Sequence, residues 1–235
     1  MALDAAKRKT RRRQRKADAR AGRRPVERRN PRETERASPP KTRDLSRLRA
    51  AAKACEACPL YRHATQTVFG EGPARAEVVF VGEQPGDQED VAGRPFVGPA
   101  GQLFNRALEE AGIDRAHAYV TNAVKHFKWE PQGKRRLHKR PGAREIGACR
   151  PWLAAELNAI RPRVLVLLGG TAAQSVLGSQ IRVLRDRGKV MPSEFCEETL
   201  VTIHPSALLR APDEAAREKN YGDFVADLRA VAKRL

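Results

Sequence analysis

Short apolar segments alternate with amphipathic segments over most of the chain. Four runs of strand length are rich in Val, Ile and Leu without polar alternation, as in parallel strands buried on both faces. These runs are residues 77–81, 119–124, 164–168 and 200–203. Helical periodicity is found at residues 101–111, 145–160, 171–177 and 213–235. Strands alternating with helices predict a doubly wound fold, so we expect a three-layer α/β/α sandwich with a central, mainly parallel four-stranded sheet.

A basic segment precedes this pattern. Residues 1–43 hold 17 Lys and Arg against 5 Asp and Glu, or +12 of the net charge of +18 carried by the 235 residues. The segment has too few large apolar side chains to offset the entropy of ordering. We therefore expect a disordered basic tail over residues 1–43 and one folded domain over residues 44–235. The tail is either a solvated segment without specific contacts or a tether that neutralises DNA phosphates.

The composition also indicates where the protein is located and what its cysteines do. The longest apolar run, residues 164–168, is too short to span a membrane, and the charged N-terminus lacks the apolar core of a secretory signal. We expect a cytoplasmic protein with no membrane partner. Four cysteines in such a chain indicate a metal or cluster site rather than a disulfide scaffold.

Polar residues follow the first predicted strand, where ligands bind in a doubly wound fold. Residues 82–90 combine glycines and a proline with several acids, and no Gly-Lys-Ser/Thr follows, which excludes a nucleotide P-loop. Phe96 lies in the Gly/Pro-rich stretch that comes next, where an aromatic ring suits base stacking. Residues 98–101 then open a helix, whose N-terminus can hold an anion. The alternative is an acidic surface turn.

A basic loop, residues 125–141, follows the second predicted strand. It interleaves Lys and Arg with Phe127, Trp129, His126 and His138. We expect the positive charge of the neighbouring residues to keep His138 neutral and so more nucleophilic. A solvated basic face or a stripe of phosphate contacts is the alternative.

The fourth predicted strand is followed by His204, Pro205 and Ser206, with Arg210 four residues further on. A histidine at a strand end, beside a hydroxyl and an arginine, suits stabilisation of an anion or a leaving group. A purely structural histidine is the alternative. Because the carboxyl ends of parallel strands meet at one edge, we expect the three loops to form one site.

These motifs resemble the uracil-DNA glycosylase superfamily from about residue 45 to residue 232. Its iron–sulfur, family-four branch has Cys-x-x-Cys before Gly-Glu-x-Pro-Gly and Gly-Arg-Pro-Phe-Val-Gly, and ends with His-Pro-Ser-x-Leu-Leu-Arg; all of these stand in this chain. Gln84 and the inserted Lys-Arg-Arg-Leu-His segment are similar to the UdgX branch in particular. Members of that branch remove uracil and become covalently attached to the abasic site that results.

The resemblance implies a role for each site residue. Phe96 would stack on uracil, Asn122 and Gln84 would contact the base, and His204 would stabilise charge on the departing base. Glu83 or Asp87 would stabilise the sugar oxocarbenium ion, and Glu83 is favoured as the nearer charge. His138 would capture the sugar in place of water. The remaining assignments are contacts to substrate by Ser206 and Arg210, and to DNA phosphates by Lys134, Arg135 and Arg136.

The resemblance also implies a [4Fe–4S] cluster, held by Cys55, Cys58, His126 and Cys149. His126 stands where the family-four pattern has its third cysteine, and an imidazole can replace a thiolate as a cluster ligand. Cys196 is the alternative fourth ligand. A zinc site with three cysteines and one histidine is the alternative metal.

The resulting expectation is a nucleoid-associated monomer that excises uracil from single- or double-stranded DNA and forms a covalent adduct in a single turnover. Two alternatives remain open at this point. One is an ordinary turnover glycosylase whose inserted segment only binds DNA. The other is a non-catalytic nucleic-acid-binding protein with a structural zinc.

Overall fold

The computed structural model describes residues 36–235, so most of the predicted tail, residues 1–35, lies outside the described residues. Contact with the folded domain begins before residue 44. Ala37 is buried, and its N–H donates to the carbonyl oxygen of Ala148 at 2.9 Å. No helix within residues 36–235 is long and apolar enough to cross a bilayer.

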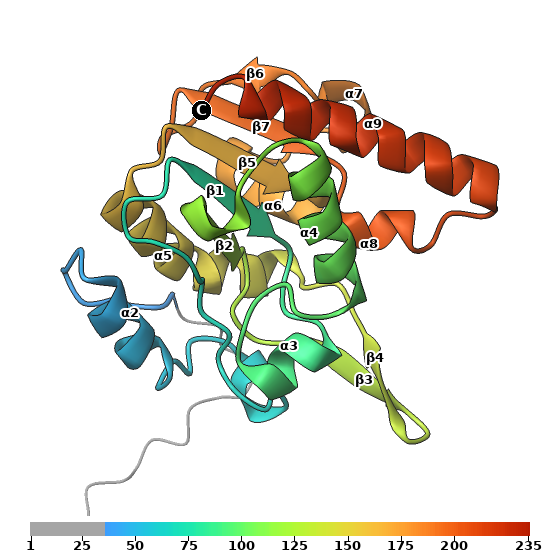
Figure 1. The fold of residues 1–235 in the computed structure, drawn as a ribbon. Helices are drawn as coiled ribbons and strands as arrows, with labels where there is room; N and C mark the ends of the chain where they lie inside the picture. Colours follow the sequence, from blue (N-terminus) through green and yellow to red (C-terminus); the bar gives the residue numbers. More distant parts are fainter. Residues whose placement is uncertain (1–35) are drawn as a thin grey trace, which may run out of the picture. The chain divides into compact units, whose positions relative to one another are not determined.

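The centre of the fold is a five-stranded sheet (Figure 1). Its strands are β1 (Val78–Gly82), β2 (Ala118–Asn122), β5 (Val164–Leu168), β6 (Val190–Met191) and β7 (Glu198–Thr202). The order is β2-β1-β5-β7-β6, with β6 antiparallel to β7 and the other pairs parallel. The mainly parallel sheet is therefore confirmed, with each predicted run forming one parallel strand. The sequence analysis missed β6, because two residues at a sheet edge carry no periodic signal.

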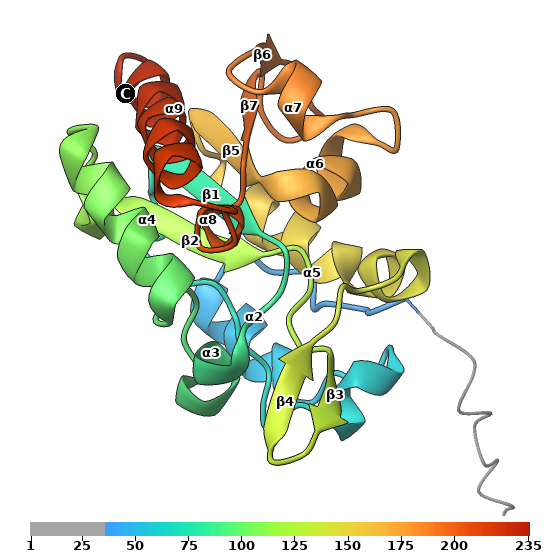
Figure 2. The same cartoon turned by 90° about the vertical axis from the view of Figure 1, so that its right-hand side faces the viewer.

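Helices cover both faces of this sheet, as Figure 2 shows. On one face lie α4 (Pro99–Glu110), α8 (Pro205–Leu208) and α9 (Glu214–Ala232); on the other lie α5 (Ala143–Ile160) and α6 (Gly169–Leu177). Successive strand side chains point to opposite faces. Phe80 and Val166 accordingly join the core under α4 and α9, while Val79 and Leu165 join the core under α5. The three-layer α/β/α architecture is confirmed.

The remaining elements are shorter and lie outside the three main layers. They are α2 (Leu45–Ala52), α3 (Asp87–Ala92), α7 (Val183–Asp186), β3 (Trp129–Gln132), β4 (Arg135–His138) and two 3₁₀ turns, Pro59–Arg62 and Arg115–His117. α2 packs against α5 through the buried side chains of Leu48 and Ala52, in a small apolar cluster of its own. This cluster ties the N-terminal segment to the sheet.

The basic insertion is a β-hairpin, where the sequence analysis expected a loop. β3 and β4 pair antiparallel, with Trp129 opposite His138. Gly133 turns the chain with a φ of 58°, a left-handed value that glycine adopts at little cost. Pro131 and the run of basic side chains hide any alternation in the sequence. The hairpin therefore puts His138 at the end of a strand rather than in a free loop.

Candidate active site

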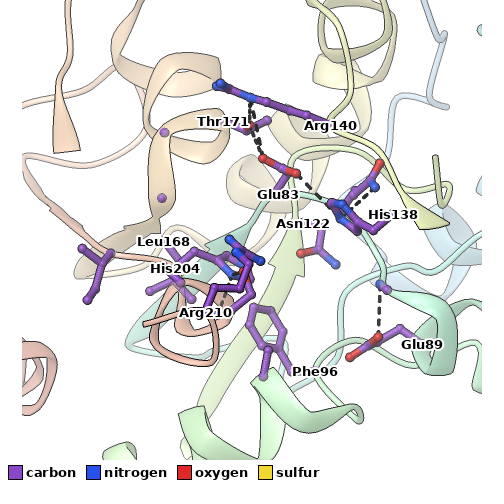
Figure 3. A pocket seen from close by; sticks show the side chains of 18 of the residues that line it. Glu83, Glu89, Phe96, Asn122, His138, Arg140, Leu168, Thr171, His204 and Arg210 are labelled. Carbon is purple, nitrogen blue, oxygen red and sulfur yellow. Dashed lines mark hydrogen bonds and ion pairs between the residues drawn. The ribbon is translucent and has the colours of Figure 1, made fainter. Parts of the chain in front are cut away.

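A cavity of about 780 Å³ opens at the carboxyl edge of the sheet (Figure 3). The loops after β1, β2 and β7 and the end of β4 all contribute to its walls. Eight residues predicted from the sequence line it: Glu83, Gln84, Phe96, Asn122, His138, His204, Ser206 and Arg210. The structure thus brings the three predicted loops into one site.

Gly82, the last residue of β1, allows three side chains to converge. A Cβ at this position would lie 2.3 Å from Oδ1 of Asn122, 2.9 Å from Cζ of Phe96 and 3.4 Å from Nε2 of His204. The rings of Phe96 and His204 are inclined by only 29°, with centroids 6.2 Å apart. These groups bound a slot with an apolar flat wall and polar edges, a shape that suits a planar heterocycle.

The backbone of Phe96 is strained. Its φ of 57° is uncommon for a residue with a side chain. Gly101 makes this conformation possible, because a Cβ there would lie only 1.9 Å from the carbonyl oxygen of Phe96. The sequence Phe-Val-Gly-Pro-Ala-Gly therefore builds the turn that presents the ring to the slot.

His204 is a neutral imidazole with an assigned tautomer. The N–H of Ser206 donates to Nδ1 at 3.1 Å, so Nδ1 carries no proton and Nε2 does. Burial, with the charges of Arg210 and His138, lowers the pKa of His204 to about 4. At neutral pH, Nε2–H is therefore a donor on the side of the slot near Gly82.

The side chain of Gln84 holds both ends of the hairpin and contacts His138. Its Oε1 accepts from the N–H of Lys128 at 3.1 Å, while its Nε2 donates to the carbonyl oxygens of Lys128 and Lys139 at 3.2 and 3.0 Å. The same Nε2 lies 3.0 Å from Nε2 of His138. Because an amide nitrogen donates and does not accept hydrogen bonds, this contact favours the tautomer whose Nε2 carries a lone pair and no proton.

The neutrality of His138 has a different main cause from the one expected. Partial burial lowers its pKa, Arg210 adds to this effect, and Glu83 opposes it. The neighbouring charges of the hairpin, which the sequence analysis invoked, are not the source. The side chain is still 49 % exposed and lines the cavity, so its Nε2 could bond a molecule there by giving up the contact with Gln84.

Glu83 is the carboxylate beside the imidazole. Its Oε1 lies 3.8 Å from Nε2 of His138, and its Oε2 accepts from the hydroxyl of Thr171 at 2.5 Å. The guanidinium of Arg140 lies 3.9 Å from Oε2 and donates to the same Thr171 hydroxyl. Asp87, the other acid predicted for this role, does not line the cavity. The geometry favours Glu83 over Asp87.

Arg136 is committed to protein contacts, whereas the sequence analysis expected it to bind phosphate. Its guanidinium pairs with Asp87 at 2.5 Å and with Asp90 at 2.6 Å. It also lies over the rings of Phe127 and Trp129, 5.4 and 5.6 Å from their centroids. Both acids come from α3, so Arg136 fastens the hairpin to that helix. Two predicted phosphate contacts, Lys134 and Arg135, remain exposed at the hairpin.

Sequence analysis missed three residues that shape the cavity: Glu89, Arg140 and Thr171. Glu89 accepts from the N–H groups of Gly86 and Gly98, at 3.1 and 2.9 Å. Its carboxylate is therefore the anion at the start of α4, where the sequence allowed an external one. Its position in the first turn of α3 was the available signal. Thr171 had none, because only the fold brings it to Glu83.

Three of the predicted metal ligands are neighbours. Cys55, Cys58 and Cys149 belong to one apolar cluster with α2 and α5. Burial raises the pKa of Cys149 to about 12, and each of the other two thiols, if ionised, would raise it further. Burial also raises the pKa of Cys58. A bound cation would stabilise such thiolates, so the chemistry of these side chains suits a metal or an iron–sulfur cluster.

The structure separates the two candidates for the fourth ligand. His126 is buried, its Nε2 lies 2.9 Å from the hydroxyl of Thr67, and burial lowers its pKa to about 4. Cys196 lies in the core under α5 and α6, with its thiol 3.1 Å from the carbonyl oxygen of Arg163. Within residues 36–235, no three His, Cys, Asp or Glu side chains are already arranged to hold a metal ion.

The sequence that forms this fold and cavity matches a known family. The model of the uracil DNA glycosylase superfamily matches residues 69–229, and the chain belongs to that superfamily. It is 37 % identical over 192 residues to the type-4 uracil-DNA glycosylase of Pyrobaculum aerophilum, covering 79 % of this chain and 91 % of that protein. It is 40 % identical over 159 residues to the type-4 enzyme of Thermotoga maritima, covering 67 % and 79 %.

A more distant similarity is also found. The type-5 uracil-DNA glycosylase of Pyrobaculum aerophilum is 32 % identical over 139 residues, covering 51 % of this chain and 58 % of that protein. The greater coverage of the type-4 proteins agrees with the family-four motifs in the sequence.

The contact between Arg136 and Asp90 is expected to stabilise the fold. Asp90 is fully buried, so Asp90→Asn leaves the guanidinium without its buried countercharge and should lower the free energy of unfolding by about 3 kcal/mol. Asp87→Asn is the matched control: its side chain is 57 % exposed, and the loss should stay below about 1 kcal/mol. Chemical denaturation measures both. Equal losses of unfolding free energy in the two variants would contradict the larger contribution assigned to Asp90.

His204 is expected to make stability depend on pH. Its pKa is near 6.5 when unfolded and about 4 when folded, so the unfolded chain binds the proton first as the pH falls. Between pH 6.5 and 4, the free energy of unfolding of the wild-type protein should fall by up to about 3 kcal/mol more than that of His204→Asn. Above pH 6.5 the two proteins should show no such difference. Denaturation series at several pH values test this. The exposed His117→Asn should keep the wild-type profile; an identical profile for His204→Asn would refute the assignment.

Proposed function

We propose that the protein is a uracil-DNA glycosylase that excises uracil from DNA and is then linked through His138 to the abasic sugar. The type-4 relatives support excision of uracil. The observation that supports the covalent step is the placement of His138, which lines the cavity with its Nε2 3.8 Å from the carboxylate of Glu83 and facing the amide nitrogen of Gln84. Single turnover follows from that link.

Excision requires the nucleotide to leave the base stack and enter the slot beside Gly82. Phe96 supplies the flat apolar wall, and the side chain of Asn122 supplies the amide at the base edge. The Nε2–H of His204 would donate to a carbonyl oxygen of uracil, where negative charge develops as the C1′–N1 bond breaks. A donor whose partner gains charge only in the transition state accelerates the bond cleavage.

Glu83 would stabilise the positive charge that develops on the sugar. The C1′–N1 electron pair leaves with uracil, so the sugar becomes an oxocarbenium ion. Thr171 and Arg140 hold one carboxylate oxygen of Glu83, and the other oxygen faces His138. A carboxylate fixed in this way needs no reorganisation when the cation forms.

His138 would then take the place of water. The lone pair on Nε2 forms a bond to C1′, the proton on Nδ1 of the substituted imidazole is released to solvent, and the uracil anion takes up a proton. The product has no good leaving group at C1′, because a neutral imidazole ring is bonded there. An ordinary turnover glycosylase differs only in that water attacks C1′.

The test is the variant His138→Ser. It should excise uracil and release a cleavable abasic product, since water can reach the sugar, but it should form no heat-stable complex with the DNA. Denaturing electrophoresis after incubation with a uracil-containing oligonucleotide measures both outcomes. His117→Ser, which alters an exposed histidine away from the cavity, should crosslink as the wild type does.

Each other outcome contradicts part of the proposal. Crosslinking by His138→Ser would show that another residue is the nucleophile. A wild-type protein that releases abasic DNA without a crosslink would be an ordinary turnover glycosylase. If neither excision nor a crosslink occurred, the non-catalytic nucleic-acid-binding alternative would stand.

We also propose that Cys55, Cys58, His126 and Cys149 hold a [4Fe–4S] cluster. The three neighbouring thiols support this, and so does the neutral imidazole of His126, which is the form that binds a metal. Either ring nitrogen of His126 could bind the cluster, and binding through Nε2 would displace the contact with Thr67. Such a cluster would act structurally, clamping α2 and the loop after β2 to α5.

Iron content separates the candidate ligands. Cys149→Ser should lose most of the bound iron and the visible absorption of the cluster. Cys196→Ser is the matched control and should keep both, because its thiol lies in a different part of the core. Stoichiometric zinc in a colourless wild-type protein would refute the cluster. Loss of iron from Cys196→Ser would refute the ligand assignment.

Contacts to the DNA backbone would come mainly from residues outside the cavity. Lys134 and Arg135 are exposed on the hairpin, and Arg210 lies at the cavity wall. The basic residues 1–43 would add affinity by releasing counterions from phosphates, without reading sequence. The partner is uracil-containing DNA, bound by a monomer.

A further inference from the structure

Lys125 is a buried lysine between the slot and the thiol cluster. Its side chain is only 1 % exposed, and its ammonium donates to the main-chain carbonyl oxygen of Asn122 at 2.7 Å. The same ammonium donates to the hydroxyl of Thr121 at 2.6 Å. At the other end of the residue, the main-chain N–H donates to Sγ of Cys149 at 3.2 Å. One residue thus contacts both sites.

The countercharge of Lys125 is Glu156, whose side chain is fully buried. One carboxylate oxygen pairs with the ammonium of Lys125. The other accepts from the N–H of Gly70 at 2.9 Å and from the hydroxyl of Tyr119 at 2.8 Å. The carboxylate is therefore held by several donors from different segments and has little freedom to move.

Helix α5 contacts Lys125 at two places. Cys149 and Glu156 are both on α5 and are seven residues apart, which places them two turns apart on one helix face. Cys149 accepts a hydrogen bond from the main-chain N–H of Lys125, and Glu156 accepts one from its ammonium. The helix that carries a cluster ligand therefore also determines where the ammonium lies.

A gain in stability does not explain this buried ion pair well, because the desolvation of two buried charges often cancels their attraction. The need to position Asn122 explains it better. The side chain of Asn122 fills the space that a Cβ at Gly82 would take, so the amide lies close against the main chain of β1 at the wall of the slot. A misplacement of about 1 Å at a reacting group can cost about a hundredfold in rate.

We infer that Lys125 and Glu156 are positioning residues, which hold the main chain of Asn122 so that its side-chain amide stands at the base edge, and which tie that position to α5. The inference rests on the proposed excision of uracil. The thiol cluster would then be connected to base recognition, because one face of α5 carries both Cys149 and Glu156.

A double-mutant cycle on the full-length, iron-loaded protein tests this. The first variant is Lys125→Met/Glu156→Gln, which removes both charges and keeps the site filled; the second is Asn122→Ala; the third combines them. If the pair acts through Asn122, the first two should each slow single-turnover excision of uracil about tenfold or more, and the combination should add less than about twofold. The half-saturating protein concentration should change less than the maximal rate.

Two controls separate positioning from loss of structure. Tyr221→Phe removes a tyrosine hydroxyl that donates to Glu110, away from Lys125, Glu156 and the cavity, and should excise at the wild-type rate. Iron content and melting temperature should show that each variant is folded and loaded. If this charge-free variant does not fold, Lys125→Gln/Glu156→Gln also removes both charges but keeps hydrogen-bonding groups at both positions, and it should show the same non-additivity with Asn122→Ala.

The outcomes distinguish the two proposals. A wild-type protein that excises no uracil would refute the proposed function. If the wild type excises uracil but the effects of the charge-free variant and Asn122→Ala multiply, the pair does not act through Asn122 and the inference fails. Wild-type excision by a folded, charge-free variant would also overturn it.

Discussion

The amide of Gln84 is the contact on which the arrangement of the site depends. It lies two residues after β1, an inner strand of the sheet, and its two polar atoms bond the main chain at both ends of the hairpin. The same nitrogen faces the imidazole of His138. Arg136 fastens the hairpin to α3, and Gln84 joins both hairpin ends to the segment that follows β1. Through these contacts, the edge of the sheet determines where the imidazole lies.

The acids of the α3 region divide their tasks by position. Glu89 neutralises the starts of two helices, and Asp87 and Asp90 bind Arg136 of the hairpin. Glu83 remains beside His138, held by an uncharged hydroxyl and a more distant guanidinium. Residues 83–90 look like one acidic turn in the sequence, but their four carboxylates differ in role. Glu83 lies beside His138 in the cavity, and the other three bind neighbouring segments of the protein.

The sequence was sufficient for the parallel strands, because continuous apolar runs indicate burial on both faces. It also placed Phe96, in a glycine-rich turn, and His204, after a strand end, at the cavity. Asn122, the last residue of β2, was proposed only through the family resemblance. The sequence was insufficient for contacts made across the fold. Arg136 looked like a phosphate contact because its acidic partners are 46 and 49 residues away. Lys125 looked like part of a solvated basic loop, since its countercharge lies on a distant helix. Only the packing separates Cys196 from the other thiols.

The central claim is that Nε2 of His138 becomes bonded to the sugar carbon from which uracil departs. The most direct measurement is mass spectrometry of the wild-type protein after reaction with a uracil-containing oligonucleotide, followed by digestion with nuclease and protease. The account predicts a deoxyribose-derived mass on the peptide that contains His138, with fragmentation that places it on the imidazole. The same mass on a lysine or on another histidine, or unmodified protein beside free abasic DNA, would contradict it.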